Sequence, residues 1–274
     1  MDAPERRLRK GYLDLSDGQL HCHHVAGQEP AIVFLHQTAS AAGTYDALLA
    51  ELRLPNRLVA MDTPGFGGSF DPPGNPTMED YARWILEGLD ALGIDAFHLF
   101  GHHTGANLAI EIALRHPDRA RSVMLAGPAF MTDEERTDFL RDYSEPIRPT
   151  RDGMHLIENW RYAAVYNPDC DVETLHREVT FMLRAWRGRA QAYRAVGSHD
   201  AIARARILRC PALLLTSPDD FFHSGMDRAR AILPDASLAV TAGGNFQPAA
   251  DPTGVARAIE VFLQTTSADG QPAR

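Results

Sequence analysis

The sequence has few cysteines and no segment apolar enough to cross a membrane. Its three cysteines are odd in number and widely spaced, so they predict neither a disulfide framework nor a C-x-x-C metal site. No apolar run approaches the roughly 18 to 20 residues that a transmembrane helix needs. The charged start MDAPERRLRKGY lacks the apolar core of a secretory signal. These absences predict a cytoplasmic protein with no membrane partner.

Basic residues are also in deficit. The chain has 27 Lys and Arg against 36 Asp and Glu, a formal net charge of −9, and its basic residues are scattered. This balance argues against nucleic acid or an anionic membrane surface as a partner. We therefore expect a small-molecule substrate as the partner, and a homodimer stays among the open oligomeric states.

What the chain does have is an alternation of short apolar segments with amphipathic helical stretches. Its 274 residues, 45% of them hydrophobic, fit one large domain or one domain with an insertion. The alternation predicts an α/β fold, a mostly parallel eight-stranded sheet covered by helices, which opens with an antiparallel pair. The expected strands are GYLDLS, QLHCHHVAG, AIVFLH, RLVAMD, AFHLFG, SVMLAG, PALLLTS and SLAVTAG.

The segment between the sixth and seventh strands is too long for a simple crossover. It contains the helical stretches DEERTDFLRDY and DVETLHREVTFMLRAWRGRAQAYRAV. We interpret it as a helical cap, residues 130–205, inserted into a core of residues 1–129 and 206–274, over the sheet edge where open α/β folds bind ligands. Its bulky residues recur at helix-like spacing and either form the core of the cap or line a pocket; they are Phe139, Trp160, Tyr162, Tyr166, Phe181, Met182, Trp186 and Tyr193.

The stretch HLFGHHTGANLAIEIALRHP predicts a buried strand, a tight turn framed by glycines, and a helix. That layout normally presents a catalytic serine at the turn. Here His103 stands at the centre, between Gly101 and Gly105, so an imidazole occupies the place of the nucleophile.

Five segments occur in order at the ends of the expected strands: FLHQTAS, MDTPGFGGS, GHHTGA, SPDD and GGNFQPAADP. With them the chain resembles the α/β-hydrolase superfamily, particularly its capped, cofactor-free members, over roughly residues 10 to 265. The resemblance implies an α/β-hydrolase core with a cap between strands six and seven, without a cofactor or a metal. It is specific for the fold and much less so for the reaction.

The resemblance also implies positions for a catalytic acid and a base. The acid follows the seventh strand, where Asp220 fits best and Asp219 is the alternative. The base normally follows the eighth strand, but Asn245 stands there, and an amide cannot accept a proton near neutral pH. With neither serine nor histidine in place, acyl transfer by the usual relay is excluded on two counts.

Three interpretations remain for His103. It is a general base, oriented by Asp220 directly or through Asn245, in hydrolysis by bound water or in a lyase, isomerase or cyclase step. It is a nucleophile that forms an acyl-imidazole. Or catalysis is lost and the pocket only binds a ligand. A different alignment would make His223 the base.

Further residues are expected around this site. The backbone of Thr104 and the loop His36-Gln37-Thr38 are the expected oxyanion donors, and Gln247 is expected to point into the pocket. Trp160 and Trp186 are expected to bind substrate. Three cap arginines could pair with an anionic substrate group: Arg161, Arg184 and Arg187.

The resulting prediction is a cofactor-independent enzyme that acts on a small carbonyl-containing molecule. Hydrolysis of an ester, lactone or carbon–carbon bond is the default reaction. A metal is not expected, because His36, His102 and His103 show no established ligand spacing.

Overall fold

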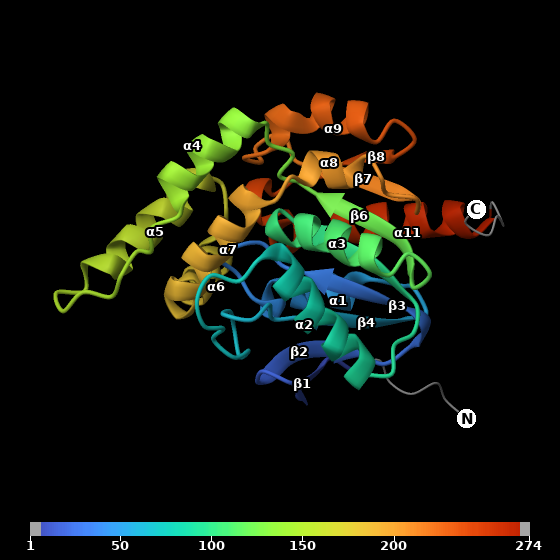
Figure 1. Ribbon diagram of the computed structural model, residues 1–274, viewed down its shortest axis with the longest axis horizontal. Helices are drawn as coiled ribbons and strands as arrows, with labels where there is room; N and C mark the ends of the chain where they lie inside the picture. The colour runs from blue at the N-terminus through green and yellow to red at the C-terminus, as the bar shows by residue number, and fades with distance from the viewer. Residues whose placement is uncertain (1–6, 269–274) are drawn as a thin grey trace.

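An eight-stranded sheet runs through the computed structural model, which describes residues 7–268 (Figure 1). The strand order is β1-β2-β4-β3-β5-β6-β7-β8; the β1–β2 and β2–β4 pairs are antiparallel and all later pairs are parallel. The strands are β1 (Arg9–Asp14), β2 (Gln19–Val25), β3 (Gln28–Leu35), β4 (Asn56–Met61), β5 (Phe97–His102), β6 (Ala120–Ala126), β7 (Ala212–Thr216) and β8 (Ser237–Val240). The predicted mostly parallel, eight-stranded α/β sheet is confirmed.

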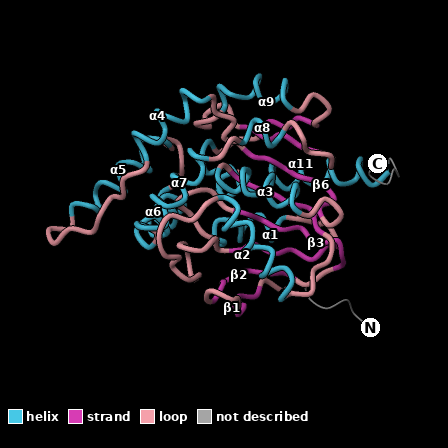
Figure 2. The backbone as a smooth tube through the Cα atoms, in the orientation of Figure 1, coloured by secondary structure: helices cyan, strands magenta, loops and turns pink. Residues whose placement is uncertain are grey.

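Helices cover both faces of this sheet (Figure 2). On one face α2 (Met78–Ala91), α3 (Thr104–Arg115), α8 (Ala201–Ala205) and α9 (Met226–Ile232) pack on the larger apolar core. On the other face α1 (Asp46–Glu51) and α11 (Pro252–Ala268) close a second core. The middle strands are apolar on both sides for this reason: residues 31–35 of β3 are fully buried.

Four longer helices lie between β6 and β7 in the chain and form an arm beyond one end of the sheet (Figure 1). They are α4 (Asp133–Tyr143), α5 (Met154–Tyr166), α6 (Val172–Arg184) and α7 (Trp186–Ser198). A capping box starts α4, because Thr132 and Glu135 satisfy each other's backbone N–H groups. We name α4–α7 the inserted helices; the division at 130 and 205 stays a prediction.

The expected helical stretch 171–196 is helical but divided in two. Ala185 leaves the helical conformation and separates α6 from α7. Apolar periodicity continues across this break and therefore does not reveal it.

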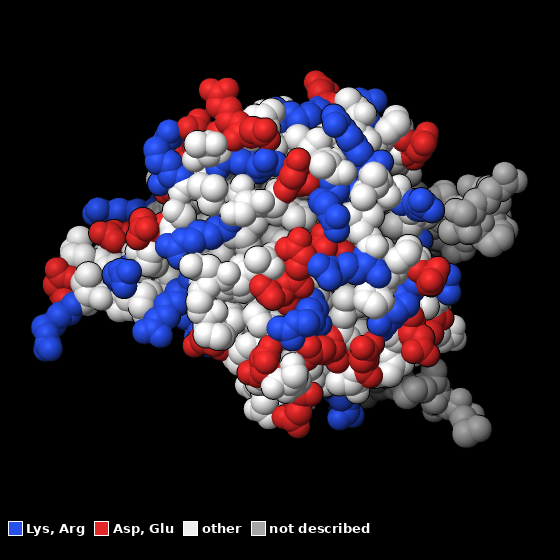
Figure 3. Space-filling model, in the orientation of Figure 1, with Lys and Arg blue, Asp and Glu red and all other residues white. Residues whose placement is uncertain are grey.

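The surface carries charges of both signs. On the face shown in Figure 3, basic and acidic side chains are interspersed. Within the described residues, no helix combines the length and the apolar character needed to span a bilayer.

Candidate active site

The turn between β5 and α3 presents His103. Its backbone has φ 48° and ψ −107°, a conformation that side-chain-bearing residues rarely adopt. The flanking glycines permit the turn, because a Cβ on Gly101 would lie 2.1 Å from the carbonyl oxygen of Gly105, and one on Gly105 would lie 1.9 Å from that of Leu35. His103 thus stands at the N-terminus of α3, at the carboxyl edge of the sheet.

His103 is paired with the acidic residue that follows β7. Its Nε2 lies 2.7 Å from Oδ2 of Asp220, and the side chains are 11% and 0% exposed. The structure thus has the direct alternative, in which Asp220 contacts the imidazole itself. Asp219 is exposed and makes no such contact.

Asp220 is held by further donors. Its Oδ1 accepts a hydrogen bond of 2.8 Å from the backbone N–H of Phe222, and its Oδ2 accepts one of 3.1 Å from Nε2 of Gln247. Burial opposes ionisation, but the attraction to the His103 imidazole and the hydrogen bonds outweigh it and lower the pKa of Asp220. Asp220 is therefore an ionised acceptor at neutral pH.

This pairing assigns the protons on His103. An ionised carboxylate can only accept, so Nε2 of His103 carries a hydrogen, and in the neutral ring the lone pair is on Nδ1. Among the described residues Nδ1 has no hydrogen-bond partner, and His103 lines a cavity. The imidazole therefore offers a basic nitrogen to whatever occupies that cavity.

Gln247, the first residue of α10 (Gln247–Ala250), lies behind Asp220 rather than in the pocket. It is fully buried, and its Oε1 accepts a hydrogen bond of 2.8 Å from Oγ1 of Thr241. Its expected place in the pocket was wrong, because both ends of its amide are used elsewhere: Nε2 donates to Asp220 and Oε1 accepts from Thr241.

Asn245 does not join the pair. Its Oδ1 accepts from the backbone N–H of Phe221 and its Nδ2 donates to the carbonyl of Tyr166, each at 2.8 Å. The expectation that Asn245 orients His103 is therefore not met. Instead it lines the cavity and ties the end of α5 to the loop after β7.

Residues expected as oxyanion donors line the same cavity as His103. Gln37, Thr38 and Thr104 all line the cavity, and Oγ1 of Thr104 donates to Oγ1 of Thr38 at 2.9 Å. The N–H of Thr104 belongs to the first turn of α3, so it has no acceptor within the helix. The sequence prediction for Gln37, Thr38 and Thr104 thus agrees with their place in the cavity lining.

His36 fixes the conformation of this loop through hydrogen bonds at both of its ring nitrogens. Its Nδ1 donates to the carbonyl of Gln37 at 2.8 Å and its Nε2 accepts from the N–H of Thr63 at 3.0 Å. Burial lowers the pKa of His36, so the ring is neutral. Both nitrogens are used, and His36 positions the loop rather than contacting a substrate.

The cavity lies between the inserted helices and the core, with about 650 Å³ of space free of protein atoms including its mouth. Five of the eight bulky residues that recur at helix-like spacing in the expected cap line this cavity: Phe139, Tyr162, Tyr166, Met182 and Tyr193. The expected role of Trp160 and Trp186 was wrong, since neither lines it. His223 is exposed, bonds Thr216 at 2.9 Å and is absent from the lining.

One group in the described part of the chain could hold a metal. His102, His103 and Asp220 each offer a ligand atom, and these atoms lie within 4.8 Å of one another. Burial and the charge of His103 lower the pKa of His102 well below its usual range, and its nitrogens have no partners in the described residues. The short contact between His103 and Asp220 is, however, that of a hydrogen-bonded dyad.

The arrangement can be compared with known proteins. Residues 30–152 match the family model described as alpha/beta hydrolase fold. The chain is superimposable on a thermophilic esterase of Thermogutta terrifontis, with a TM-score of 0.74 and 20% identity over 95% of this chain and 99% of that one. The chain has the α/β-hydrolase fold.

Two relatives show how far the likeness extends. The fluoroacetate dehalogenase of a Burkholderia species is 25% identical over 94% of this chain and 93% of its own length. The 2-hydroxymuconate semialdehyde hydrolase of Pseudomonas putida is 32% identical over 46% of each chain. The chain likewise spans less than half of two further curated relatives, 42% and 32% of their lengths.

Several residues that line the cavity were not anticipated. Tyr143 ends α4, Asn167 follows α5, and Phe221 and Phe222 follow Asp220. The repeated aromatic residues beside Asp220 were a usable signal, since the loop after β7 reaches the carboxyl edge. No sequence signal marks Asn167, because its place depends on where α5 ends.

Proposed function

We propose that the chain is a cofactor-independent α/β-hydrolase-fold enzyme that acts on a small carbonyl-containing substrate, with a His–Asp dyad in place of a serine-based triad. The observation that carries the proposal is the 2.7 Å contact from Nε2 of His103 to Asp220, which leaves Nδ1 as a base at the cavity. The hydrolases and dehalogenase among the relatives support the reaction class.

In the default reaction His103 activates water. Nδ1 removes a proton while the water oxygen bonds to the substrate carbonyl carbon, and the carbonyl electron pair moves onto oxygen. The N–H of Thr104 and the Gln37 amide stabilise that oxyanion. When the intermediate collapses, the bond to the leaving group breaks and the imidazolium returns the proton to it. Asp220 stabilises the transient positive charge on the ring.

Gln247 positions this dyad. It donates to the same oxygen of Asp220 that accepts from His103, and Thr241 fixes the orientation of its amide. Because the Gln247 amide is anchored at its other end, rotation of the Asp220 carboxylate would disrupt its three hydrogen bonds, from His103, Phe222 and Gln247. The base is thus held at the elbow by a partner that follows β8.

The same dyad favours a second candidate reaction, proton abstraction from carbon. A basic Nδ1 facing a cavity with oxyanion donors can also remove a proton from the carbon next to a carbonyl group and leave an enolate. Many lyase, isomerase and cyclase steps begin this way. They differ from hydrolysis in that no water oxygen enters the product.

The test is a screen of neutral esters, lactones and β-diketones in water enriched in oxygen-18 and, in parallel, in deuterium oxide, with product analysis by mass spectrometry. Label in an acid product supports hydrolysis, and unlabelled product with deuterium exchange at carbon supports the second candidate. An acyl adduct on His103 after rapid quenching would make the residue a nucleophile. Ligand binding without turnover of any compound would contradict an enzymatic role.

A further inference from the structure

The cavity lining carries no acidic or basic side chain apart from the imidazole of His103. Among the described lining residues there is no Lys, Arg, Asp or Glu. Transfer of an unpaired anion from water into such surroundings is strongly unfavourable. The cavity therefore favours a molecule without net charge.

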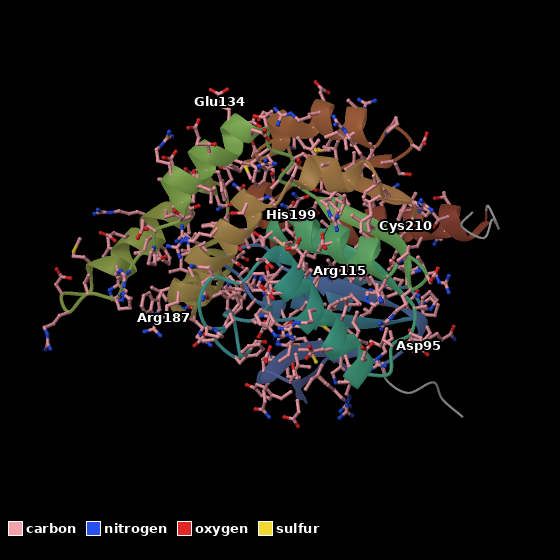
Figure 4. The ribbon with its side chains drawn as sticks, viewed as in Figure 1. Asp95, Arg115, Glu134, Arg187, His199 and Cys210 are labelled. Atoms are coloured by element: carbon pink, nitrogen blue, oxygen red, sulfur yellow. The ribbon has the colours of Figure 1, made fainter. Side chains whose placement is uncertain are left out.

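The three arginines expected to bind an anion lie elsewhere. Arg161 is exposed, and Arg184 donates to Asp71 at 3.0 Å. The guanidinium of Arg187 lies 4.6 Å from the ring centroid of Trp186, on the outer side of the inserted helices (Figure 4). None lines the cavity, so that hypothesis is corrected.

One buried cation lies behind the cavity wall. The guanidinium of Arg189 lies 4.3 Å from the ring centroid of Tyr162, and its Nη1 donates to Oδ1 of Asn159 at 3.2 Å. Arg189 is not a lining residue. Its charge stabilises the aromatic wall and offers no direct ion pair to a ligand.

Aromatic rings form much of the wall. Rings from the inserted helices meet rings from the loop after β7, as in the pair Tyr166 and Phe221, whose centroids lie 6.0 Å apart. Nearer the base, the ring of Phe222 lies 5.1 Å from that of His103, edge to face. Such walls pack best against a flat, unsaturated molecule.

Asn167 adds a polar requirement. It lines the cavity and is 8% exposed, and its Nδ2 donates to the carbonyl of Ala163 at 2.9 Å. Its Oδ1 is buried and has no partner among the described residues. A buried acceptor without a donor is costly, and a ligand hydroxyl or N–H group would satisfy it.

We propose that the substrate is an uncharged, flat, unsaturated carbonyl compound that also carries a hydroxyl or N–H donor, and that Asn167 selects it by accepting that donor. This inference rests on the proposed function, because it assigns the carbonyl to His103. Asn167 is thus a specificity-determining residue, and the rings around it exclude water from the bound body of the molecule.

The experiment compares four esters that differ only at the para position: methyl benzoate and its para-hydroxy, para-methoxy and para-carboxylate derivatives. Binding to the full chain is measured by calorimetry, and turnover is followed separately by chromatography. The variant is Asn167→Leu, which keeps the volume and removes the acceptor. Circular dichroism and the melting temperature show whether it folds.

For the wild-type protein we expect the para-hydroxy ester to bind about tenfold more tightly than the para-methoxy ester, and the carboxylate to bind weakest. In Asn167→Leu that preference should disappear. A carboxylate that binds tightest, or a hydroxyl preference that survives in a folded Asn167→Leu, overturns the proposal. If the variant does not fold, the order of the four esters on the wild type decides alone.

These outcomes are separable from a failure of the proposed function. Selective binding of the para-hydroxy ester without turnover would retain this ligand class and remove the enzymatic role. Turnover without preference among the neutral esters would retain the enzymatic role and remove the proposed selection by Asn167.

Discussion

Replacement of Asp220 by Asn tests the proton assignment on His103. Asp220 accepts three hydrogen bonds: from Phe222 N–H and from the side chains of His103 and Gln247. If the carbonyl oxygen of the new Asn serves Phe222, its NH₂ group faces His103 and Gln247, which are both donors. The conflict is relieved when His103 moves its proton to Nδ1, so that Nε2 can accept. Nδ1 is then no longer a base.

The expected loss follows from that change of tautomer. An Asp-to-Asn change at a carboxylate that orients a catalytic histidine lowers the rate about 10⁴-fold. Here we expect about 10³- to 10⁴-fold in kcat/KM, or roughly 4–5.5 kcal/mol of transition-state stabilisation. Because the side chain of Asp220 is fully buried, the altered hydrogen bonds should also cost about 1–3 kcal/mol of unfolding free energy.

The assay combines steady-state kinetics on the best ester with nitrogen-15 NMR of the histidine rings. Asp219→Asn is the matched control, because it makes the same change one position earlier on an exposed side chain. It should leave the rate and the tautomer unchanged. A folded Asp220→Asn protein with the wild-type rate, or with its His103 proton still on Nε2, would refute the reasoning.

Three further predictions concern residues around the dyad and the inserted helices. Gln247→Leu removes the hydrogen bond that Gln247 donates to Asp220 and the one that it accepts from Thr241. We therefore expect kcat to fall about 10- to 100-fold with little change in KM. Wild-type kinetics would contradict the positioning role of Gln247. Gly127→Ala places a Cβ 2.6 Å from His103 Cδ2 and 2.8 Å from Asp220 Oδ1, at a backbone φ of +52°. The new methyl group should displace the dyad, so kcat should fall in a protein that still folds. An unchanged kcat would show that the dyad tolerates displacement. Burial raises the pKa of Glu178 on α6 above its usual 4.5, so the contribution of the protonated side chain to stability is full below pH 4.5 and is lost as the pH rises. Glu178→Gln should therefore have a higher melting temperature than the wild type at about pH 8, and the difference should close toward about pH 4. A difference in melting temperature that does not depend on pH would contradict the assignment.

Local sequence patterns were sufficient to predict the sheet and the elbow. All eight expected strands are present, because β-rich apolar runs bounded by turn residues depend on near neighbours in the chain. His103 and Asp220 were also predicted as partners. Both follow strands whose carboxyl ends meet at one edge, so the topology brings them together.

The partners of individual polar side chains were harder to predict. Asn245 and Gln247 are two positions apart, and the sequence does not show which one faces Asp220. A short helical turn, η3 (Gly244–Phe246), directs Asn245 toward α5 and leaves Gln247 against the dyad. Likewise, the aromatic spacing of the inserted helices does not say which face meets the core, and so Trp160 and Trp186 were misplaced.

The most direct test of the central claim is the turnover of methyl para-hydroxybenzoate by the wild-type protein and by His103→Ala, at equal concentration and with folding checked by circular dichroism. The account predicts ester hydrolysis by the wild type and a loss of at least about 10³-fold in the variant, since no second basic side chain lines the cavity within residues 7–268. Equal rates in the two proteins would show that the imidazole at the elbow does not carry the chemistry.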